Sequence, residues 1–479
     1  MRRPSDPPVV IRKANASTRV LLVHAPYPGR LKFDSQPSSL LCAASGVIEA
    51  LDEQGRLDEV GYLDPRGATE EFYKELSSIV AAGNVQVVCA STSTAAIEEA
   101  ARVASVSRAS APGDVLIVGG GPHEDDVDEK MAHRLTDYDI SIAGDAEQVL
   151  WSVVRMALER GSAAAVLSLG DIARDPRLKG RGVISVTGGH RHEWVSRTPV
   201  GPELVLHRPW TDRVVNFPVF GNRPTLPLMI SRGCSYGKCT FCAEAGGGRQ
   251  SVVGDFSRIQ ALIDGHPGAA LYFQDSIFPS SKFVREKLLP MLRDSGRPWG
   301  CQIYLPTLSS RFANDLAQSG CNYLYTGIES GSEELRAAVG KGGLRSSVLE
   351  RKAQVIGATG MRLGISVMLG VLDRKGWLLE SPESLKETLV AVRRVQESVP
   401  EVAGVYPNVL TVLPGTALAG ILRGHESFYR MPLSGEFREI EDGEVGYNFL
   451  TLGCIEQSGA LVSGIKVATS ALLQMVSAC

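Results

Sequence analysis

The chain has 479 residues, and its 50 Lys and Arg residues nearly balance its 53 Asp and Glu residues, which gives a formal charge of -3. This near-neutral charge argues against a nucleic-acid-binding protein that works through bulk charge, because phosphate contacts need a clustered basic excess. Hydrophobic residues make up 44% of the chain and charged residues 22%, which excludes wholesale disorder. The length predicts two or three domains, each large enough to bury its own core.

The N-terminus and the cysteines predict a cytoplasmic protein. Residues 1–17 are basic but contain no apolar stretch long enough for a signal peptide, and no later apolar run predicts a membrane-spanning helix. The chain has nine cysteines, an odd number, without an export signal. Such cysteines indicate reduced thiols or metal ligands rather than a disulfide framework. We therefore expect a cytoplasmic location and no membrane partner.

After a flexible tail at residues 1–17, strands and helices alternate as far as residue 185. The expected strands are Arg19–His24, Glu59–Leu63, Val85–Ala90, Val115–Val118 and Asp139–Ala143, and the expected helices are Leu40–Leu51, Glu70–Val80, Ala95–Val106 and a segment after Glu147. This order predicts an α/β fold with a doubly wound parallel sheet (Rossmann- or flavodoxin-like) over residues 18–185. Ligands on such a sheet bind at the carboxyl ends of the strands, where the loops Ser91–Thr94 and Gly119–His123 are expected.

Residues 186–224, the end of a hairpin and a linker, lead into a second series of strands and helices. A glycine pair between two short apolar runs predicts the hairpin within residues 182–198. The expected strands of the second series are Leu226–Ser231, Ala270–Gln274, Gly300–Leu305, Tyr323–Gly327, Leu363–Leu369 and Asn408–Leu413, and the expected helices include Ser281–Asp294, Ser309–Ser319, Glu333–Val339 and Ser384–Glu397. Six such repeats over residues 225–420 predict a partial (β/α)6 barrel with its site at the carboxyl ends of the strands. Residues 421–479 are expected to form a small helical extension.

The most specific motif is a loop that holds Cys234, Cys239 and Cys242 just after an expected strand. A glycine-bearing loop can fold back and bring these thiols to one metal centre. A structural zinc site needs four ligands, and the sequence has neither a second CxxC pair nor a histidine at finger-like spacing. An iron–sulfur cluster needs only three cysteines when one iron takes an exogenous ligand. The pattern therefore favours a cluster over a zinc site or three unrelated core cysteines.

On these cysteines the chain resembles the radical S-adenosylmethionine (SAM) superfamily. The usual spacing in that family is C-x3-C-x2-C, whereas this chain has C-x4-C-x2-C, one residue longer in the first gap. The resemblance runs over about residues 226–420 and implies that Cys234, Cys239 and Cys242 hold a [4Fe-4S] cluster. It also implies that Phe241, the aromatic residue before the last cysteine, lies near the adenine of SAM.

Later segments, in chain order, resemble the barrel strands that contact SAM in this family. The residues that the resemblance assigns to SAM binding are Gln274 and Asp275 on the second strand, Glu329 and Ser330 on the fourth, Ser366 on the fifth and Leu413 at the end of the sixth. Each segment alone is a weak signal. Their order after a triple-cysteine loop carries the resemblance. Tyr304, Tyr325 and Tyr406, on or beside expected strands, are candidates for lining a substrate cavity, and an ordinary packing role fits them equally well.

Residues 18–160 resemble the cobalamin (B12)-binding-like domain that is often fused ahead of this barrel. The resemblance implies that cofactor contacts come from the loops after two strands, at Ser91, Thr92, Gly119, Gly120 and Gly121. The D-x-H-x-x-G signature, which supplies an axial histidine in some cobalamin enzymes, is absent. Members of the fused family commonly lack that histidine, so cobalamin stays an open cofactor beside the [4Fe-4S] cluster and SAM.

We therefore interpret the chain as a radical SAM enzyme. The resemblance implies that a reduced cluster cleaves SAM to a 5′-deoxyadenosyl radical, which abstracts hydrogen from an unactivated C–H bond of a small natural-product intermediate, for example in antibiotic biosynthesis. Cobalamin-dependent C-methyl transfer is the favoured reaction. The alternative is a lyase-type dehydration, epimerisation or rearrangement, such as diol dehydration of an aminoglycoside-type sugar, with an empty first domain.

An alternative of another class is a non-catalytic iron–sulfur or zinc binding protein, which would neither bind nor cleave SAM. As an enzyme, the chain is expected to have a small-molecule substrate and a flavodoxin- or ferredoxin-type electron donor, or a partner reductase. Relatives in the superfamily also modify RNA. The near-neutral charge and the lack of an appended basic domain count against a nucleic-acid substrate here.

Overall fold

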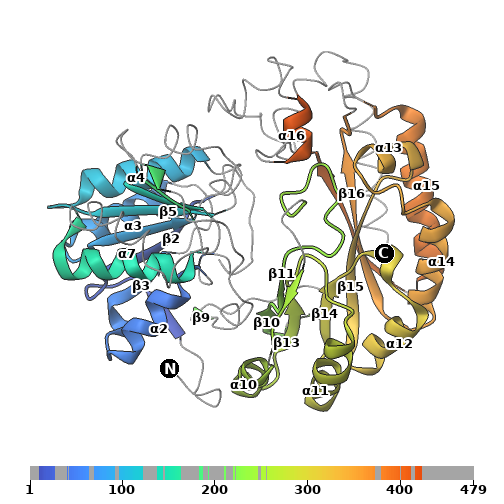
Figure 1. Ribbon diagram of the computed structural model, residues 1–479, viewed down its shortest axis with the longest axis horizontal. Helices are drawn as coiled ribbons and strands as arrows, with labels where there is room; N and C mark the ends of the chain where they lie inside the picture. The colour runs from blue at the N-terminus through green and yellow to red at the C-terminus, as the bar shows by residue number, and fades with distance from the viewer. Residues whose placement is uncertain are drawn as a thin grey trace. The chain divides into compact units, whose positions relative to one another are not determined.

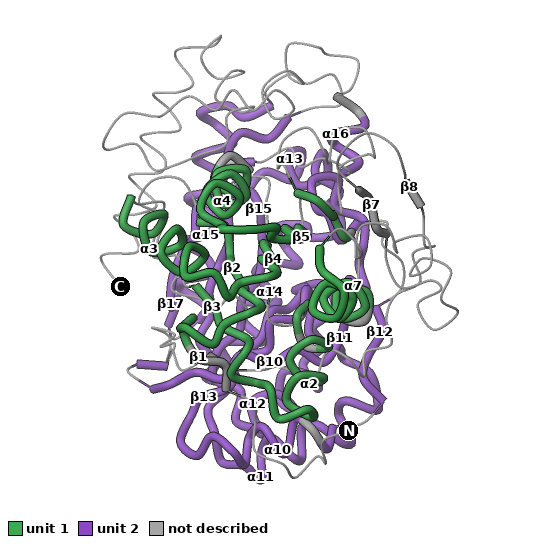
Figure 2. Tube along the Cα trace, turned by 90° about the vertical axis from the view of Figure 1, so that its left-hand side faces the viewer, with its two compact units in different colours: residues 1–215 green, residues 216–479 purple. Residues whose placement is uncertain are grey.

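The computed structural model divides the chain into two compact units, residues 1–215 and residues 216–479 (Figures 1 and 2). It describes residues 10–26, 40, 43–63, 70–91, 97–121, 138–143, 146–162, 183–186, 192–193, 210–211, 220–221, 223–245, 250–254, 256–372, 379–399, 401–410 and 416–422. Within these residues, no helix has both the length and the apolar character needed to cross a membrane.

The first unit contains a nine-stranded sheet in the order β8-β7-β6-β5-β4-β2-β3-β1-β9. Its strands are β1 (Val10–Lys13), β2 (Val20–His24), β3 (Val60–Leu63), β4 (Val87–Ser91), β5 (Leu116–Gly120), β6 (Ile140–Ala143), β7 (Val183–Val186), β8 (His192–Glu193) and β9 (Trp210–Thr211). Seven neighbouring strands of this sheet pair in parallel, in the order β6-β5-β4-β2-β3-β1-β9. β7 and β8 join as an antiparallel hairpin, as the glycine pair predicts.

Helices cover both faces of this sheet, which confirms the predicted doubly wound fold. The helices are α2 (Ser45–Glu53), α3 (Glu70–Ala81), α4 (Ile97–Ser110) and α7 (Glu147–Arg160). On β2, Leu22 packs in a core with residues of α2 and α7, whereas Leu21 packs in a second core with residues of α3 and α4. Successive strand residues point to opposite faces, so strands buried on both sides read as continuous apolar runs.

The prediction of a flexible tail at residues 1–17 is wrong for its second half. Val10–Lys13 form β1, which pairs in parallel with β3 and β9. Two β-branched residues, Val10 and Ile11, favour a strand, but four residues are too few to show a periodic pattern. A tight turn then leads into β2. Within this turn the amide of Asn15 donates to Oγ1 of Thr18 (2.9 Å). Residues 1–9 lie outside the described part of the chain.

The second unit is a six-stranded parallel sheet in the order β10-β13-β14-β15-β16-β17, which confirms the predicted partial barrel. The strands are β10 (Thr225–Leu228), β13 (Ala270–Phe273), β14 (Trp299–Gln302), β15 (Cys321–Glu329), β16 (Arg362–Leu369) and β17 (Val402–Val409). The helices are α10 (Ser257–Gly265), α11 (Leu289–Ser295), α12 (Ser310–Gln318), α13 (Glu333–Ala338), α14 (Ser346–Gly357), α15 (Pro382–Ser398) and α16 (Ala417–Leu422). Figure 1 shows α12, α14 and α15 along the outer side of this sheet.

The sixth barrel strand lies earlier than predicted. The sequence analysis expects Asn408–Leu413, whereas β17 spans Val402–Val409. Gly404 and Pro407 interrupt the apolar pattern and so hide the strand. β17 is the last strand of the described sheet, and proline is tolerated on such an edge because its missing N–H removes no ladder bond on the open side.

Candidate functional site

The cysteine loop lies at the carboxyl end of β10, between the short antiparallel strands β11 (Ser231–Arg232) and β12 (Ser251–Val252). Cys234, Cys239 and Cys242 are free thiols and partly exposed. The carboxyl ends of parallel barrel strands are where function is expected. The three cysteines therefore stand where the sequence analysis places the site.

Two anchors fix the loop to the segment after α13. The amide of Thr240 donates to the carbonyl oxygen of Val339 (3.1 Å), and Oη of Tyr236 donates to that of Gly340 (2.5 Å). The ring of Tyr236 also packs on Tyr304, with 4.2 Å between the ring centroids. The loop is thus held by the barrel and not only by its own turns.

The three thiols lie within electrostatic range of one another. Burial raises the pKa of Cys239 to about 12, the ammonium of Lys341 opposes that rise, and the thiol of Cys242 adds to it. Burial also raises the pKa of Cys242, and Cys234 contributes in the same direction. Bound metal would replace the thiol protons, because thiolates are the ligands that metals take.

The three thiols could serve a cluster, whose demands differ from those of a single ion. In the described ranges, no three His, Cys, Asp or Glu side chains are close enough together to hold one metal ion. A cubane cluster places its irons at separate corners, each with its own thiolate, so its ligands need not meet at one point. Three cysteines would also leave the fourth iron open to an exogenous ligand.

A strained turn at Glu329 ends β15 beside this loop. Among the described residues, Glu329 is the only non-glycine residue with a positive φ, 62°. The amide of Ser330 donates to the carbonyl oxygen of Ile328 (2.8 Å), which closes a γ-turn of the strained form. Such strain persists where the surroundings fix it, and it concentrates at functional sites.

Lys341 pairs with Glu329 in the interior of the protein. Its Nζ lies 2.5 Å from Oε1 of Glu329 and donates to the carbonyl oxygen of Gly327 (3.0 Å). Both side chains are largely buried, with exposed fractions of 11% and 7%. A Cβ at Gly327 would lie 2.2 Å from that carboxylate, so the glycine makes room for the pair.

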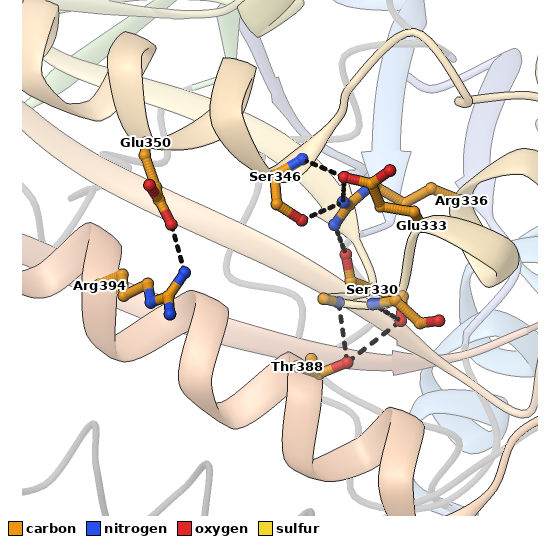
Figure 3. A network of polar contacts seen from close by, with 9 residues as sticks. Ser330, Glu333, Arg336, Ser346, Glu350, Thr388 and Arg394 are labelled. Atoms are coloured by element: carbon orange, nitrogen blue, oxygen red, sulfur yellow. Dashed lines mark hydrogen bonds and ion pairs between the residues drawn. The ribbon is translucent and has the colours of Figure 1, made fainter.

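Ser330, the residue after the strained turn, belongs to a buried network that Figure 3 shows. Its Oγ lies 3.1 Å from Oγ1 of Thr388 on α15, which also accepts from the amide of Gly331 (2.9 Å). The guanidinium of Arg336 donates to the carbonyl oxygen of Ser330 (2.5 Å) and to Oγ of Ser346 (2.9 Å). The structure thus gives the Ser330 hydroxyl partners within the protein, and its predicted role toward SAM stays a prediction.

At the end of β13, Asp275 supports the start of the cysteine loop. Its Oδ1 accepts from the amide of Ile230 (3.1 Å) and from Oγ of Ser231 (2.5 Å), and the residue is almost fully buried. Gln274 is half-buried, and its amide donates to the carbonyl oxygen of Leu228 (2.7 Å). Both predicted residues therefore lie next to the loop.

Phe241 and Ser366 make their contacts with different parts of the barrel. Phe241 packs against an apolar cluster of residues near the carboxyl ends of β16 and β17, formed by Leu335, Val339, Met368, Val371, Leu372, Leu410 and Leu418. Oγ of Ser366 accepts from Nδ2 of Asn408 (2.9 Å), and the nearby rings of Tyr325 and Tyr406 are 5.6 Å apart. Leu413 lies outside the described residues.

In the first unit, the predicted cofactor residues lie at the carboxyl edge of the sheet. Ser91 ends β4 and is in register with His24 of β2 and Gly120 of β5. The chain passes from β2 to β3 on one side and returns to β4 on the other, which makes this edge a topological switch point, where ligands bind. Gly121 has φ 128°, a conformation that favours glycine. Thr92 lies outside the described residues.

Comparison with known proteins finds solved structures that share this architecture. No protein-family model and no curated protein matches the chain. The radical SAM methyltransferase TsrM from Kitasatospora setae, with cobalamin and a [4Fe-4S] cluster bound, matches with a TM-score of 0.59 and 16% identity, over 90% of this chain and 82% of TsrM. The cobalamin-dependent radical SAM enzyme OxsB, with aqua-cobalamin and SAM bound, matches with a TM-score of 0.57 and 14% identity, over 91% of this chain and 63% of OxsB.

A further TsrM structure, with tryptophan substrate and the SAM analogue aza-SAM bound, has a TM-score of 0.56 and 17% identity, over 83% of this chain and 74% of TsrM. The chain has the fold of cobalamin-dependent radical SAM enzymes. This confirms the fold class that the order of the strands predicts, and it bears out the resemblance at the level of the fold. At these identities the likeness concerns the fold.

Two buried residues of the site were given no role from the sequence. Lys341 begins the Lys341-Gly342 pair that accompanies the fourth-strand segment in the family resemblance, but the sequence gives its ammonium neither a role nor an inward direction. Glu380 accepts a hydrogen bond from the amide of Gly370 just beyond β16, and burial raises its pKa to about 7. In both cases the signal is burial of a charged group, which depends on packing between distant segments.

Proposed function

We propose that the chain is a radical SAM enzyme that holds a [4Fe-4S] cluster, SAM and cobalamin, and that it transfers a methyl group to a carbon atom of a small-molecule substrate. The observation that carries the proposal is the three-thiol loop of Cys234, Cys239 and Cys242 at the carboxyl end of a parallel barrel sheet. The shared fold with TsrM and OxsB supports it.

In this proposal the three thiolates would hold three irons and leave the fourth open to SAM. When bound, the reduced cluster and SAM supply a 5′-deoxyadenosyl radical, and cobalamin supplies a carrier for the methyl group. The chain's own residues bind and orient these groups. Phe241, with its apolar cluster, would cover the adenine and exclude water, and the buried Glu329–Lys341 pair would face the polar part of SAM.

Cobalamin would be held by the first unit, at the carboxyl ends of β2, β4 and β5. Ser91, Gly120 and Gly121 are small residues on neighbouring strand ends, so a broad, flat cofactor can approach the backbone there. At Gly119 the ring of Tyr138 fills the space in which a side chain would lie, and a Cβ at Gly120 would lie 2.9 Å from the carbonyl oxygen of Ile142. The axial-histidine signature is absent, which is compatible with cobalamin held by the carboxyl edge of the sheet alone.

The substrate class, the electron donor and the location are part of the proposal. We infer a small natural-product intermediate as substrate, a flavodoxin- or ferredoxin-type protein as electron donor, and a cytoplasmic setting. The hydroxyl and amide groups of Tyr406 and Asn408, both exposed on β17, would contact an uncharged, polar substrate. Nucleic acid is not proposed, because the chain has no excess of basic residues.

The test is a cofactor and product analysis of protein made with cobalamin supplied and purified without oxygen. Iron, sulfide and cobalamin are measured per chain, and reduced protein is incubated with SAM labelled in its methyl group. We expect a cluster, about one equivalent of cobalamin, and 5′-deoxyadenosine as a product. In a variant with the three loop cysteines changed to Ala, the cluster should be lost and 5′-deoxyadenosine should fall to background.

The other outcomes separate the alternatives. SAM cleavage without cobalamin would favour radical dehydration, epimerisation or rearrangement with an empty first unit. Bound iron or zinc without any SAM cleavage would overturn the enzyme assignment and leave a metal-binding protein. Full iron content in the triple cysteine variant would show that the loop does not hold the cluster.

A further inference from the structure

We propose that Lys341 is a positioning residue that joins the cysteine loop to the strained turn at Glu329 and sets the charge beside the cluster. The inference rests on the proposed function, since it concerns the cluster that the loop would hold. It adds a role for a residue to which the sequence analysis gives none. Three sets of contacts support it, and each involves a different neighbour of Lys341.

The first set fastens the backbone before Lys341 to the cysteine loop. Gly340 accepts the hydroxyl of Tyr236, and its φ of 83° is one that glycine adopts readily. A Cβ at Gly340 would lie 2.2 Å from the carbonyl oxygen of Lys238 and 3.2 Å from Cα of Cys239. No larger residue fits without moving the loop, so residues 339–341 and the cysteine loop form one packed unit.

The second set extends from that unit to the end of β15. The Lys341 ammonium bonds both to the carbonyl oxygen of Gly327, two residues before the strained turn, and to the carboxylate of Glu329 within it. The backbone amide of Lys341 is itself held by the carbonyl oxygen of Arg336 (2.6 Å). Fixed at both ends, the side chain spans the distance between the loop and the turn.

The third set fixes the far side of the turn. Ser330, Thr388 and Arg336 hold the backbone just after Glu329, as Figure 3 shows for the serine and its partners. The Glu329 carboxylate therefore has its backbone fixed by this network and its direction fixed by Lys341. Without the ammonium, the carboxylate would lose its cation while remaining buried, which is costly, so the turn would relax.

The charge of Lys341 reaches the thiols as well. The ammonium lies within electrostatic range of both Cys239 and Cys242. A cation next to an electron-accepting cluster stabilises the reduced state, which carries one more negative charge, and Glu329 opposes this effect. Removing Lys341 should lower the midpoint potential of the cluster, and removing the charge of Glu329 should raise it.

The experiment is a redox titration of the reconstituted cluster, followed by electron paramagnetic resonance, in five proteins. These are the wild type, Lys341→Met, Glu329→Gln, the double variant Lys341→Met/Glu329→Gln, and the control Lys282→Met. Lys282 is an exposed lysine before α11 that pairs with Glu286 at 3.7 Å, so its loss removes the same charge from an exposed ion pair outside the buried Glu329–Lys341 pair. SAM affinity is measured from the change of the same resonance signal.

We expect a lower potential and weaker SAM binding in Lys341→Met, a higher potential in Glu329→Gln, and a value near wild type in the double variant and in Lys282→Met. Opposite shifts are the signature of charge, because a merely structural role would move both single variants the same way. If Lys341→Met does not retain a cluster, Lys341→Arg and Glu329→Gln are compared, and Lys341→Arg should keep the wild-type potential.

Potentials that agree among all the variants, with clusters intact, would overturn the inference. So would shifts of the same sign in Lys341→Met and Glu329→Gln. A wild-type protein that binds no cluster, or that binds one and does not cleave SAM, would instead contradict the proposed function. The two failures are therefore distinguishable in one set of preparations.

Discussion

The ring of Tyr138 occupies the space in which Gly119 would carry a side chain. A Cβ on Gly119 would lie 1.8 Å from Cδ2 of that fully buried ring. Gly119 stands on β5, at the start of the glycine run that the sequence analysis assigns to cofactor contact. The structure shows that this first glycine is needed for packing inside the unit. Gly120 and Gly121 lie one and two residues further on, at the carboxyl edge of the sheet, and a Cβ at Gly120 would lie 2.9 Å from the carbonyl oxygen of Ile142.

Gly119→Ala should therefore destabilise the first unit, with or without cobalamin. Overpacking of a buried site costs about 1–3 kcal/mol, and a rigid aromatic ring leaves little room to relax. The matched control is Gly113→Ala, since a Cβ there meets no atom within 4 Å. Thermal unfolding of the protein without cofactors measures both. A Gly119→Ala variant as stable as Gly113→Ala would mean that Tyr138 moves aside freely.

Gly340→Ala should reduce iron incorporation because its Cβ would push against the cysteine loop. The control is Gly360→Ala. Both glycines have a left-handed backbone, with φ of 83° and 74°, but a Cβ at Gly360 meets nothing within 4 Å. The backbone strain of about 1–2 kcal/mol is thus common to both variants, and only Gly340→Ala adds the clash. Iron bound per chain after anaerobic reconstitution should fall several-fold in Gly340→Ala and stay near wild type in Gly360→Ala.

Equal iron content in these two variants would show that the clash is absorbed elsewhere. Equal loss in both would assign the effect to backbone strain alone. Thermal unfolding of the same preparations, before reconstitution, shows how much of any loss reflects a less stable barrel. The expected result is a similar small decrease in the unfolding temperature of both variants, with a further decrease for Gly340→Ala.

The parts of the fold that could be predicted are those written in local patterns. The strand Val20–His24 is buried on both faces, so its apolar run is visible without a partner. The cysteines of the loop share one short segment, so their spacing alone indicates a cluster. The sequence does not show β1, which is only four residues long, and it misplaces β17, which contains Gly404 and Pro407. Both strands form because they pair with a neighbouring strand.

The residues of the site that could not be predicted depend on contacts between distant segments. The glycine run of β5 shows no sign of Tyr138, which lies 19 positions further along the chain. The Glu329–Lys341 pair is separated by a strand end, a helix and a turn, and its burial becomes evident only when the barrel is assembled. The sequence indicated which segments carry the site, and the packing determines what each side chain does there.

Glu380 should make the stability of the second unit depend on pH. Burial raises the pKa of its carboxyl to about 7, although the amides of Gly370 and Val371 donate to it and oppose the rise. Because the folded-state pKa is raised, its stabilising contribution is fully present below the unfolded-state value of about 4.3 and is lost as the pH rises through 7. The loss amounts to roughly 3 kcal/mol for a shift of this size.

The comparison is between the wild type and Glu380→Gln at pH 5 and pH 8. The amide of Gln keeps an acceptor for Gly370 but does not ionise. The wild type should lose stability relative to Glu380→Gln as the pH rises, and Glu383→Gln, a change of an exposed carboxylate at the start of α15, should show no such trend. A wild type that gains stability over the same interval would mean that Glu380 is ionised in the folded protein.

Thr388→Val should destabilise the second unit through the turn that follows Glu329. The hydroxyl of Thr388 donates to the carbonyl oxygen of Ser384 (2.9 Å) and accepts from the buried amide of Gly331 (2.9 Å). Valine has nearly the same shape, so the loss is that of hydrogen bonds in a buried place, about 1–3 kcal/mol. Thr388→Ser keeps the hydroxyl and should lose less.

A third variant calibrates this expectation against an exposed contact in the same view. Arg394 on α15 lies 2.5 Å from Glu350 on α14, and both side chains are well exposed, so Arg394→Ala should cost less than about 1 kcal/mol. Thermal unfolding of the three variants gives the order, with Thr388→Val the least stable. If Thr388→Val were as stable as Thr388→Ser, the amide of Gly331 would have found another acceptor, and the turn at Glu329 would not depend on Thr388.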